Sequence, residues 1–279
     1  MFIGRNLTIV TKHEKEKAIG PVLNEGLGVN CTTSCGIDTD QLGTFSGEIE
    51  RLLSPVDAAR AKCNLALKVH GVDLIVANEG SFFPHPMVPF LTISEEVIFL
   101  VDKRNEFEFY TKRISNNLTA FSELVTNDAQ VLSFLEKTDF PNHNVIISGQ
   151  LDGVFHVFKD FSDAKEVLTK FNALLCDGSV DLKIETDLRA MNNPTRMLEI
   201  GEATRLFLQE LLSQCPHCMR YGFVVTEVLN GLPCWACGLP TLSPKEKRKE
   251  CKGCGHVDNE PFDAQKRWEE PQFCLNCNP

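Results

Sequence analysis

Residues 72–101 read VDLIVANEGSFFPHPMVPFLTISEEVIFLV, two apolar runs on either side of a stretch that is rich in proline. Short apolar runs bounded by turn signals are typical of buried strands. The central ANEGSFFPHPMVPF (77–90) contains three prolines, each of which fixes φ and limits backbone motion. We therefore expect two strands, 72–77 and 97–101, joined by a rigid loop.

The rest of residues 1–213 alternates short apolar runs with segments of helical spacing. Strands are expected at 7–10, 144–148, 153–158 and 180–185, and helices at 13–25, from Pro55 onward, at 127–137, 162–175 and 194–212. Pro21 is expected to kink or break the first helix, and Ser54 to cap the second. Strands that alternate with helices predict an α/β fold with a mixed, partly parallel sheet and flanking helices.

Composition is that of a globular protein. The chain has 279 residues, of which 43% are hydrophobic and 24% charged. It contains no apolar run of about 20 residues, the length that spans a bilayer. The first residues, MFIGRNLTIVTKHEKEK, lack the apolar core of a signal peptide, so we expect a cytoplasmic protein that makes no membrane contact. The net charge of −10 argues against a nonspecific grip on nucleic acid.

Eight of the twelve cysteines form four C-x-x-C pairs: Cys215/Cys218, Cys234/Cys237, Cys251/Cys254 and Cys274/Cys277. In a reducing compartment this pattern indicates metal rather than disulfides, and four thiolates hold one zinc ion. We therefore predict two zinc ions in a double zinc ribbon, residues 214–279, after an α/β domain, residues 1–213. Sequential pairing, first pair with second and third with fourth, is the simplest; a cross-braced pairing, first with third and second with fourth, is the alternative.

A site of four cysteines has no open position for a substrate. Zinc in such a segment usually replaces a hydrophobic core, and we take this structural role as the main reading. The alternative is that the ribbon binds a protein or a nucleic acid. Its support is the run KEKRKECK (245–252) with Trp235 and Trp268 nearby, although two glutamates in that run suit a solvated face.

A group of basic residues follows the first strand, where a helix begins. A helix N-terminus beside lysines is a natural anion site, so this group is a candidate phosphate-binding site. Hard oxygen ligands follow, which suit Mg²⁺ or Mn²⁺. The candidates for phosphate are Lys12, His13, Lys15, Lys17, Arg60 and Lys62, and those for Mg²⁺ are Asp38, Asp40, Glu48 and Glu79. The alternative is that these basic residues belong to a solvated first helical turn and bind no ligand.

Glu79 follows a predicted strand, and ligands of open α/β sheets bind at the carboxyl ends of strands. The prolines of the loop could hold Glu79 and His85 in fixed positions as catalytic groups beside Glu48; the alternative is a loop that only covers the sheet. The stretch ETDLRAMNNPTRM (185–197) could bring Asp187 as a Mg²⁺ ligand, with Arg189 and Arg196 as phosphate contacts, to the same pocket. It reads equally well as a helix-capping turn.

Motifs along nearly the whole chain resemble a largely bacterial family of uncharacterised proteins, a domain of unknown function. They are TKHEKEKAIGPVL (11–23), DTDQLGTFSGEI (38–49), SPVDAARAK (54–62), ANEGSFFPHPMVPF (77–90), ETDLRAMNNPTRM (185–197), GLPCWACGLPT (231–241) and CLNCNP (274–279). This resemblance implies no activity.

A second resemblance covers residues 7–100. The order of a strand with a basic turn, GTFSGEI, AARAK and a strand that ends in ANEGS is similar to the inosine/xanthosine triphosphate pyrophosphatases. It implies that Lys12, Lys15 and Lys17 contact phosphate, and that Glu48 and Glu79 bind metal, one of them orienting the attacking water. This chain departs from that family in having a single Glu79 where an acidic pair is expected, and its PHP segment has no counterpart there.

Two functions are therefore expected to compete. The first is a Mg²⁺-dependent hydrolase of nucleotides or phosphate esters, whose partner is a phosphorylated small molecule. The second is a non-enzymatic adaptor whose zinc ribbon binds protein or RNA. The sequence lacks the motifs of P-loop nucleotidases, α/β serine hydrolases and common zinc proteases.

Overall fold

The structure is a computed structural model that describes residues 1–34 and 53–279, except for the side chains of His70 and Phe90. Three predicted Mg²⁺ ligands, Asp38, Asp40 and Glu48, lie outside the described residues. The chain divides into two compact units, Met1–Leu208 and Gln209–Pro279. We call them the α/β unit and the zinc unit. No helix among the described residues is both long enough and apolar enough to cross a membrane.

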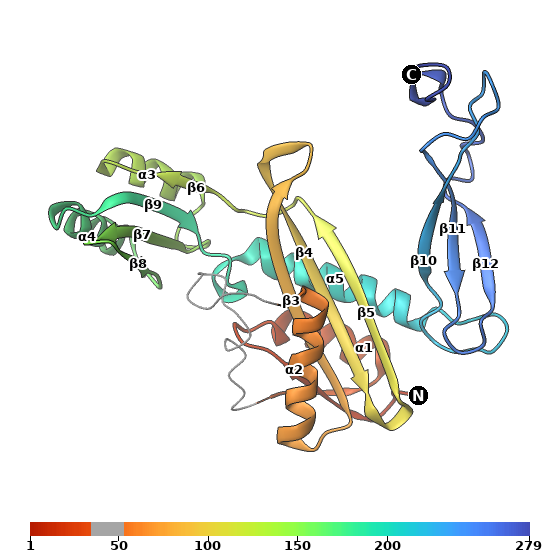
Figure 1. The fold of residues 1–279 in the computed structure, drawn as a ribbon. Coiled ribbons are helices and arrows are strands. Elements are labelled where there is room, and N and C mark those ends of the chain that lie inside the picture. Colours follow the sequence, from red (N-terminus) through yellow and green to blue (C-terminus); the bar gives the residue numbers. More distant parts are fainter. Residues whose placement is uncertain (35–52) are drawn as a thin grey trace. The chain divides into compact units, whose positions relative to one another are not determined.

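A five-stranded mixed sheet forms the centre of the α/β unit (Figure 1). Its strands, in spatial order, are β2 (Asn30–Thr33), β1 (Asn6–Val10), β3 (Leu74–His85), β4 (Val88–Asp102) and β5 (Phe107–Ser115). β2, β1 and β3 run parallel, whereas β3, β4 and β5 are antiparallel. The predicted α/β fold with a mixed, partly parallel sheet is confirmed.

Three helices accompany this sheet: α1 (Glu16–Leu27), α2 (Pro55–His70) and α5 (Pro194–Leu212). α2 begins as predicted, with Pro55 in its first turn and the Ser54 side chain accepting a hydrogen bond from the Asp57 N–H. Its Ala59, Cys63 and Ala66 pack against apolar side chains of β3 and β4. The bounds of α5 match the expected range.

Of the two effects predicted for Pro21, a kink or a break, the break is not found, because α1 continues through Pro21. Proline removes one backbone hydrogen bond of the helix interior, which costs about 3 kcal/mol or more. The buried side chains of Ile19, Leu23 and Leu27 hold the helix in place on both sides of Pro21. Tertiary packing therefore outweighs the local preference.

The predicted rigid loop at 77–90 is also wrong: β3 and β4 form a long hairpin whose turn is Pro86-Met87. β1 pairs with β3 only as far as Ala77, so beyond that residue one edge of β3 lies outside the ladder with β1. Proline is tolerated on edge strands and at bulges, because no ladder N–H is needed there. Pro84 meets both conditions, since the register shifts between Pro84 and His85.

The remaining strands of the α/β unit form a second sheet, which is antiparallel and has four strands. In spatial order they are β6 (Ser122–Leu124), β9 (Val180–Thr186), β7 (Val145–Leu151) and β8 (Val154–Phe158). Helices α3 (Asp128–Lys137) and α4 (Ala164–Cys176) share a core with this sheet that contains Phe134, Ile147 and Phe171.

The zinc unit contains a three-stranded antiparallel sheet of β10 (Val225–Asn230), β11 (Pro244–Glu250) and β12 (Val257–Pro261), in that order. Consecutive strands are neighbours, so the chain runs back and forth along the sheet (Figure 1). A small apolar cluster in this unit contains Cys215, Phe223 and Cys251, and Leu232, Cys234 and Cys274 are also buried.

Candidate functional sites

The eight predicted zinc cysteines gather in two clusters of four. The ligand atoms of Cys215, Cys218, Cys251 and Cys254 lie within 4.8 Å of one another, and so do those of Cys234, Cys237, Cys274 and Cys277. Sulfur–sulfur distances are 3.5 and 3.8 Å in the first cluster and 3.7 and 3.9 Å in the second. A tetrahedral zinc with Zn–S bonds of about 2.3 Å requires sulfurs about 3.8 Å apart. Both clusters therefore fit zinc.

The pairing is cross-braced, so the sequential pairing that we considered simplest is wrong. The reason is the sheet. One strand separates each pair of cysteines from the next, and a strand of five to seven residues spans roughly 16 to 24 Å. Each pair therefore lies at the opposite end of the sheet from the pair before it. The first and third pairs meet at one end, and the second and fourth at the other.

The turns that carry the third and fourth cysteine pairs stabilise the thiolate of the first cysteine in each pair. Backbone N–H groups of Cys254 and Gly253 stabilise the charged form of Cys251 and lower its pKa to about 6. Those of Cys277 and Asn276 lower the pKa of Cys274 to about 7. A thiolate is the form that binds zinc. In each cluster one other thiol is shifted the opposite way: burial and the neighbouring cysteines raise the pKa of Cys254 and of Cys277 to about 12.

In the α/β unit, the carboxyl edge of the parallel strands gathers five charged side chains, four of them buried and one, Lys62, partly buried. We call them the edge cluster: Lys15, Lys62, Glu79, Glu96 and Arg196. Four of them were predicted site residues. Glu96 was missed, although a glutamate before the apolar run VIFLV is unusual and could have indicated a buried charge. Asn78, which donates to Glu96 over 2.9 Å, was missed for lack of any sequence signal.

The sheet splits the edge cluster between its two faces. Side chains alternate along a strand, so Glu79 and Gly80 point to opposite faces. Glu79 forms an ion pair with Lys62 of α2 on one face. Glu96 is paired with Gly80 in the ladder and accepts from Arg196 Nε of α5 over 2.9 Å on the other face.

Lys15 lies within electrostatic range of both ion pairs. β1 ends at Val10, opposite Ala77, and the chain turns into α1 at this point, with Lys15 as its N-cap. His13 and Glu14 have φ values of +64° and +60°, which are strained for residues other than glycine. The strained turn places the Lys15 side chain, 5% exposed, beyond the end of β1.

Burial and charge shift the protonation of this site. Burial, and then the positive charges of Arg196 and Lys62, lower the pKa of Lys15 to about 7. Burial alone would raise the pKa of Glu96, but Arg196 and Lys15 outweigh burial and lower it. Glu96 is therefore ionised at neutral pH, whereas Lys15 exchanges its proton near neutrality.

Other predicted site residues lie elsewhere. Lys17 pairs with Glu14, and Arg60 with Asp57 and Glu108, all at exposed positions. Lys12 and His13 lie in the turn before Lys15 and are partly buried. His85 lies at the turn of the hairpin, where its Nδ1 accepts from the Met87 N–H.

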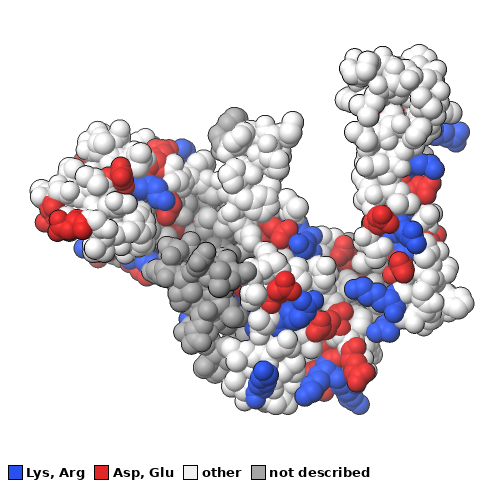
Figure 2. All heavy atoms as spheres, in the orientation of Figure 1, with Lys and Arg blue, Asp and Glu red and all other residues white. Residues whose placement is uncertain are grey.

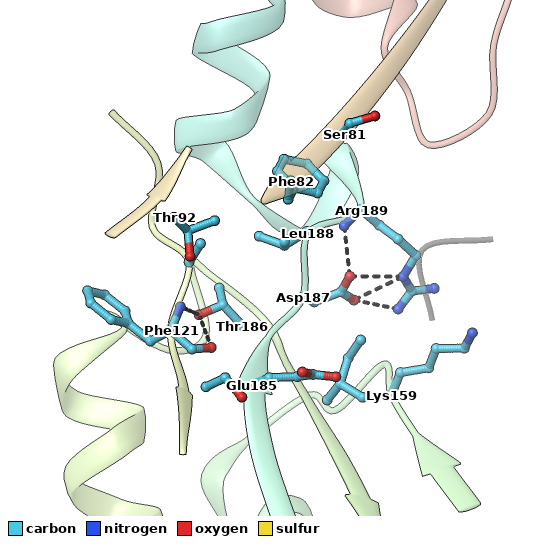
Figure 3. A pocket seen from close by; sticks show the side chains of 13 residues that line it. Ser81, Phe82, Thr92, Phe121, Lys159, Glu185, Thr186, Asp187, Leu188 and Arg189 are labelled. Atoms are coloured by element: carbon cyan, nitrogen blue, oxygen red, sulfur yellow. Dashed lines mark hydrogen bonds and ion pairs between the residues drawn. The ribbon is translucent and has the colours of Figure 1, made fainter. Parts of the chain in front are cut away.

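Asp187 and Arg189 line a separate cleft of about 470 Å³ (Figure 3). Arg189 Nε donates to both oxygens of the fully buried Asp187, over 3.1 and 2.9 Å. Asn192 and the Arg189 N–H also donate to this carboxylate. Arg189 further pairs with Asp160, so two carboxylates face its single positive charge. The full lining is Ser81, Phe82, Thr92, Ala120, Phe121, Ser122, Ile146, Lys159, Glu185, Thr186, Asp187, Leu188 and Arg189.

The cleft and the edge cluster share a wall. The Phe82 ring lies 4.9 Å from the Arg196 guanidinium, and Arg196 Nη1 donates to the Leu188 carbonyl over 2.5 Å. Phe82 and Leu188 both line the cleft.

The alternative interpretation of residues 185–197, a helix-capping turn, also has support. The Asn193 Oδ1 accepts a hydrogen bond from the backbone N–H of Arg196 at the start of α5.

The described residues include no group of three or more oxygen ligands that could share a Mg²⁺ ion. Within them, groups of three or more side chains able to share a metal are the two cysteine clusters. Glu79 and Asp187 each pair with a cation instead.

Comparison with known families shows which part of the chain a family model matches. The model of a family described as a domain of unknown function, DUF6671, matches residues 62–279. The chain belongs to the DUF6671 family. The match includes all eight zinc cysteines and four members of the edge cluster, whereas Lys15 precedes it. No curated protein matches this DUF6671 chain.

Proposed function

We propose that the α/β unit of this DUF6671 protein hydrolyses a phosphate ester or anhydride of a small molecule at the edge cluster. The observation that carries the proposal is the convergence of Lys15, Lys62 and Arg196 with two carboxylates at the carboxyl edge of parallel strands. This is the position at which open α/β sheets bind ligands. Cations outnumber carboxylates, which suits an anionic group.

Each side chain has a chemical role in this proposal. Glu79, which pairs with Lys62, accepts a proton from the attacking water. Arg196 and the protonated form of Lys15 offset the charge that develops on the phosphate oxygens. No step is assigned to a metal ion.

The test measures release of phosphate and pyrophosphate from a panel of nucleotides and simple phosphate esters. Each substrate is assayed with Mg²⁺, with Mn²⁺ and with a chelator. Glu79→Gln is expected to reduce release at least 100-fold, and Glu79→Asp to restore part of it. Glu108→Gln is the control, since Glu108 also pairs with a cation but on the exposed surface. Absence of release from every substrate by folded wild-type protein contradicts the proposal.

A second candidate function is protein binding by the zinc unit. Trp235 and Trp268 are the two tryptophans of the chain, and they are 66% and 56% exposed. The backbone N–H of Trp235 donates to the backbone carbonyl of Glu269. Glu269 follows Trp268 in the chain, and Trp235 lies between two cysteines of the second cluster. Exposed tryptophans are the residues most often found at binding hot spots. On the face in Figure 2, the end of the zinc unit near the C-terminus exposes few charged side chains.

Charge favours a protein over a nucleic acid here. Residues 209–279 contain eight Lys and Arg against nine Asp and Glu. Each zinc with four thiolates adds a charge of about −2. Affinity purification with wild type and with Trp235→Ser/Trp268→Ser tests this candidate, with Leu132→Ser on exposed α3 as control. A partner kept by the double variant, or tryptophan fluorescence quenched by single-stranded RNA, counts against it.

A further inference from the structure

The cleft beside the edge cluster has the composition of a site for a flat, polar ring. Its volume of about 470 Å³ lies within the usual range of ligand sites, roughly 300–1,000 Å³. Phe82 and Phe121 supply aromatic surface, and Leu188 supplies apolar surface (Figure 3). Ile146 also belongs to the lining. Aromatic side chains stack on heterocyclic rings through dispersion and complementary charge distribution.

Polar groups of the cleft are available to a ligand. The hydroxyl groups of Ser81, Thr92 and Ser122 line it, and within the described part of the chain these three side chains make no hydrogen bond. A hydroxyl both donates and accepts, so three of them suit a ligand with many hydroxyl and amide groups. A sugar attached to a nucleobase is such a ligand.

The charges of the cleft are nearly balanced. Arg189 is neutralised by Asp187 and Asp160, and Glu185 pairs with Lys183 over 2.7 Å. Lys159 is the further cation of the lining. A site with this balance does not favour a polyanion such as a triphosphate. The edge cluster, with three cations and two carboxylates, carries one excess positive charge when Lys15 is protonated.

The geometry points to a nucleoside with one phosphate group as the ligand: we propose that the base and sugar bind in the cleft, and that the phosphate lies toward the edge cluster. Ser81 is two residues beyond Glu79 on β3, which corresponds to about 7 Å along a strand. Phe82 and Leu188 contact both places. The place of the phosphate rests on the proposed function, whereas binding of the nucleoside part does not.

The test titrates wild-type protein with four nucleosides, their mono- and triphosphates, and ribose 5-phosphate, using calorimetry and saturation-transfer NMR. Ala120→Trp fills the cleft and is expected to weaken nucleoside binding at least ten-fold. Leu124→Trp adds the same side chain at an exposed position of β6 outside the lining, and is expected to leave binding unchanged. If Ala120→Trp does not fold, Ser81→Ala/Thr92→Val removes two of the hydroxyls without adding volume.

The outcomes separate the two proposals. Wild type that binds no nucleoside, or equal binding by wild type and both cleft variants, overturns this inference. Triphosphates that bind ten-fold tighter than monophosphates overturn the single-phosphate part. Nucleoside binding without phosphate release from any substrate keeps the cleft assignment and overturns the hydrolase. Glycerol 3-phosphate has no ring, so the Ala120→Trp variant is expected to release phosphate from it as the wild type does.

Discussion

Gly80 is the residue on which the edge cluster depends most directly. A Cβ at this position would lie 2.7 Å from Glu96 Oε1 and closer still to Arg196 Nη2. Atoms cannot approach so closely, and both side chains are buried in the sheet and α5. Glycine is needed here for space and not for an unusual backbone angle. The same lack of a side chain brings the Glu96–Arg196 pair against the backbone of β3.

Gly80→Ala is therefore expected to separate Glu96 from Arg196. Breaking a buried ion pair typically costs about 3–5 kcal/mol, and we expect a loss of unfolding free energy of about 3 kcal/mol. Urea unfolding followed by far-ultraviolet circular dichroism measures it. Gly201→Ala in α5 is the control, because the nearest atom to its new Cβ is 3.9 Å away and alanine favours a helix by about 1 kcal/mol. Equal stability of the two variants would contradict the packing argument.

Lys15 should make stability depend on pH. Burial, and then the positive charges of Arg196 and Lys62, lower its pKa from an ordinary value of 10.5 to about 7, against the opposing effect of Glu79 and Glu96. Between these values the unfolded chain binds more protons, so this site makes the unfolding free energy rise with pH. Below pH 7 the folded protein bears the full cost of a buried charged amine.

Lys15→Met removes that cost, so it should stabilise the α/β unit more at pH 6 than at pH 10. We expect the two effects to differ by at least about 1.4 kcal/mol, the equivalent of one pKa unit. Urea unfolding at a series of pH values provides the measurement, with Lys17→Met, on the exposed surface, as control. A Lys15→Met effect that is constant with pH would refute a shifted pKa.

At the scale of elements, what the sequence predicts depends on the range of the interaction. The cap at Ser54 and the bounds of α5 follow from neighbouring residues, and they are as expected. Glu96 and Arg196 are 100 residues apart, and no local pattern couples them. The hairpin of β3 and β4 was missed for a related reason, since the prolines are tolerated only because β1 ends before them.

The zinc sites show the same limit of prediction from local sequence. C-x-x-C spacing identifies the ligands, but their pairing depends on strands that place successive pairs at opposite ends of a sheet. Replacing Cys215, Cys218, Cys251 and Cys254 by serine should leave one zinc per chain, because these four form one cluster. Replacing Cys215, Cys218, Cys234 and Cys237 should leave none, because each cluster loses half its ligands. Metal analysis after dialysis against a weak chelator gives the zinc content of each variant. Sequential pairing predicts the opposite result, with no zinc in the first variant and one zinc per chain in the second.

At the scale of the whole molecule, the two units are stabilised by different means. The α/β unit buries apolar side chains in two sheets and their helices. In the zinc unit, buried apolar side chains are few, and most of them are cysteines of the two clusters that could hold zinc. A segment this small rarely folds on apolar burial alone, so bound zinc should supply much of its folding free energy.

Removing zinc should therefore unfold one unit and spare the other, and the chain provides a separate signal for each. Both tryptophans belong to the zinc unit, whereas α1 to α4 belong to the α/β unit and most of α5 does. A strong chelator should shift tryptophan emission to longer wavelength, as Trp235 and Trp268 lose the fixed backbone around them, while ellipticity at 222 nm changes little. Returning zinc should reverse the shift, and Mg²⁺ should not. Concerted loss of both signals would instead mean that the α/β unit depends on the zinc unit for its stability.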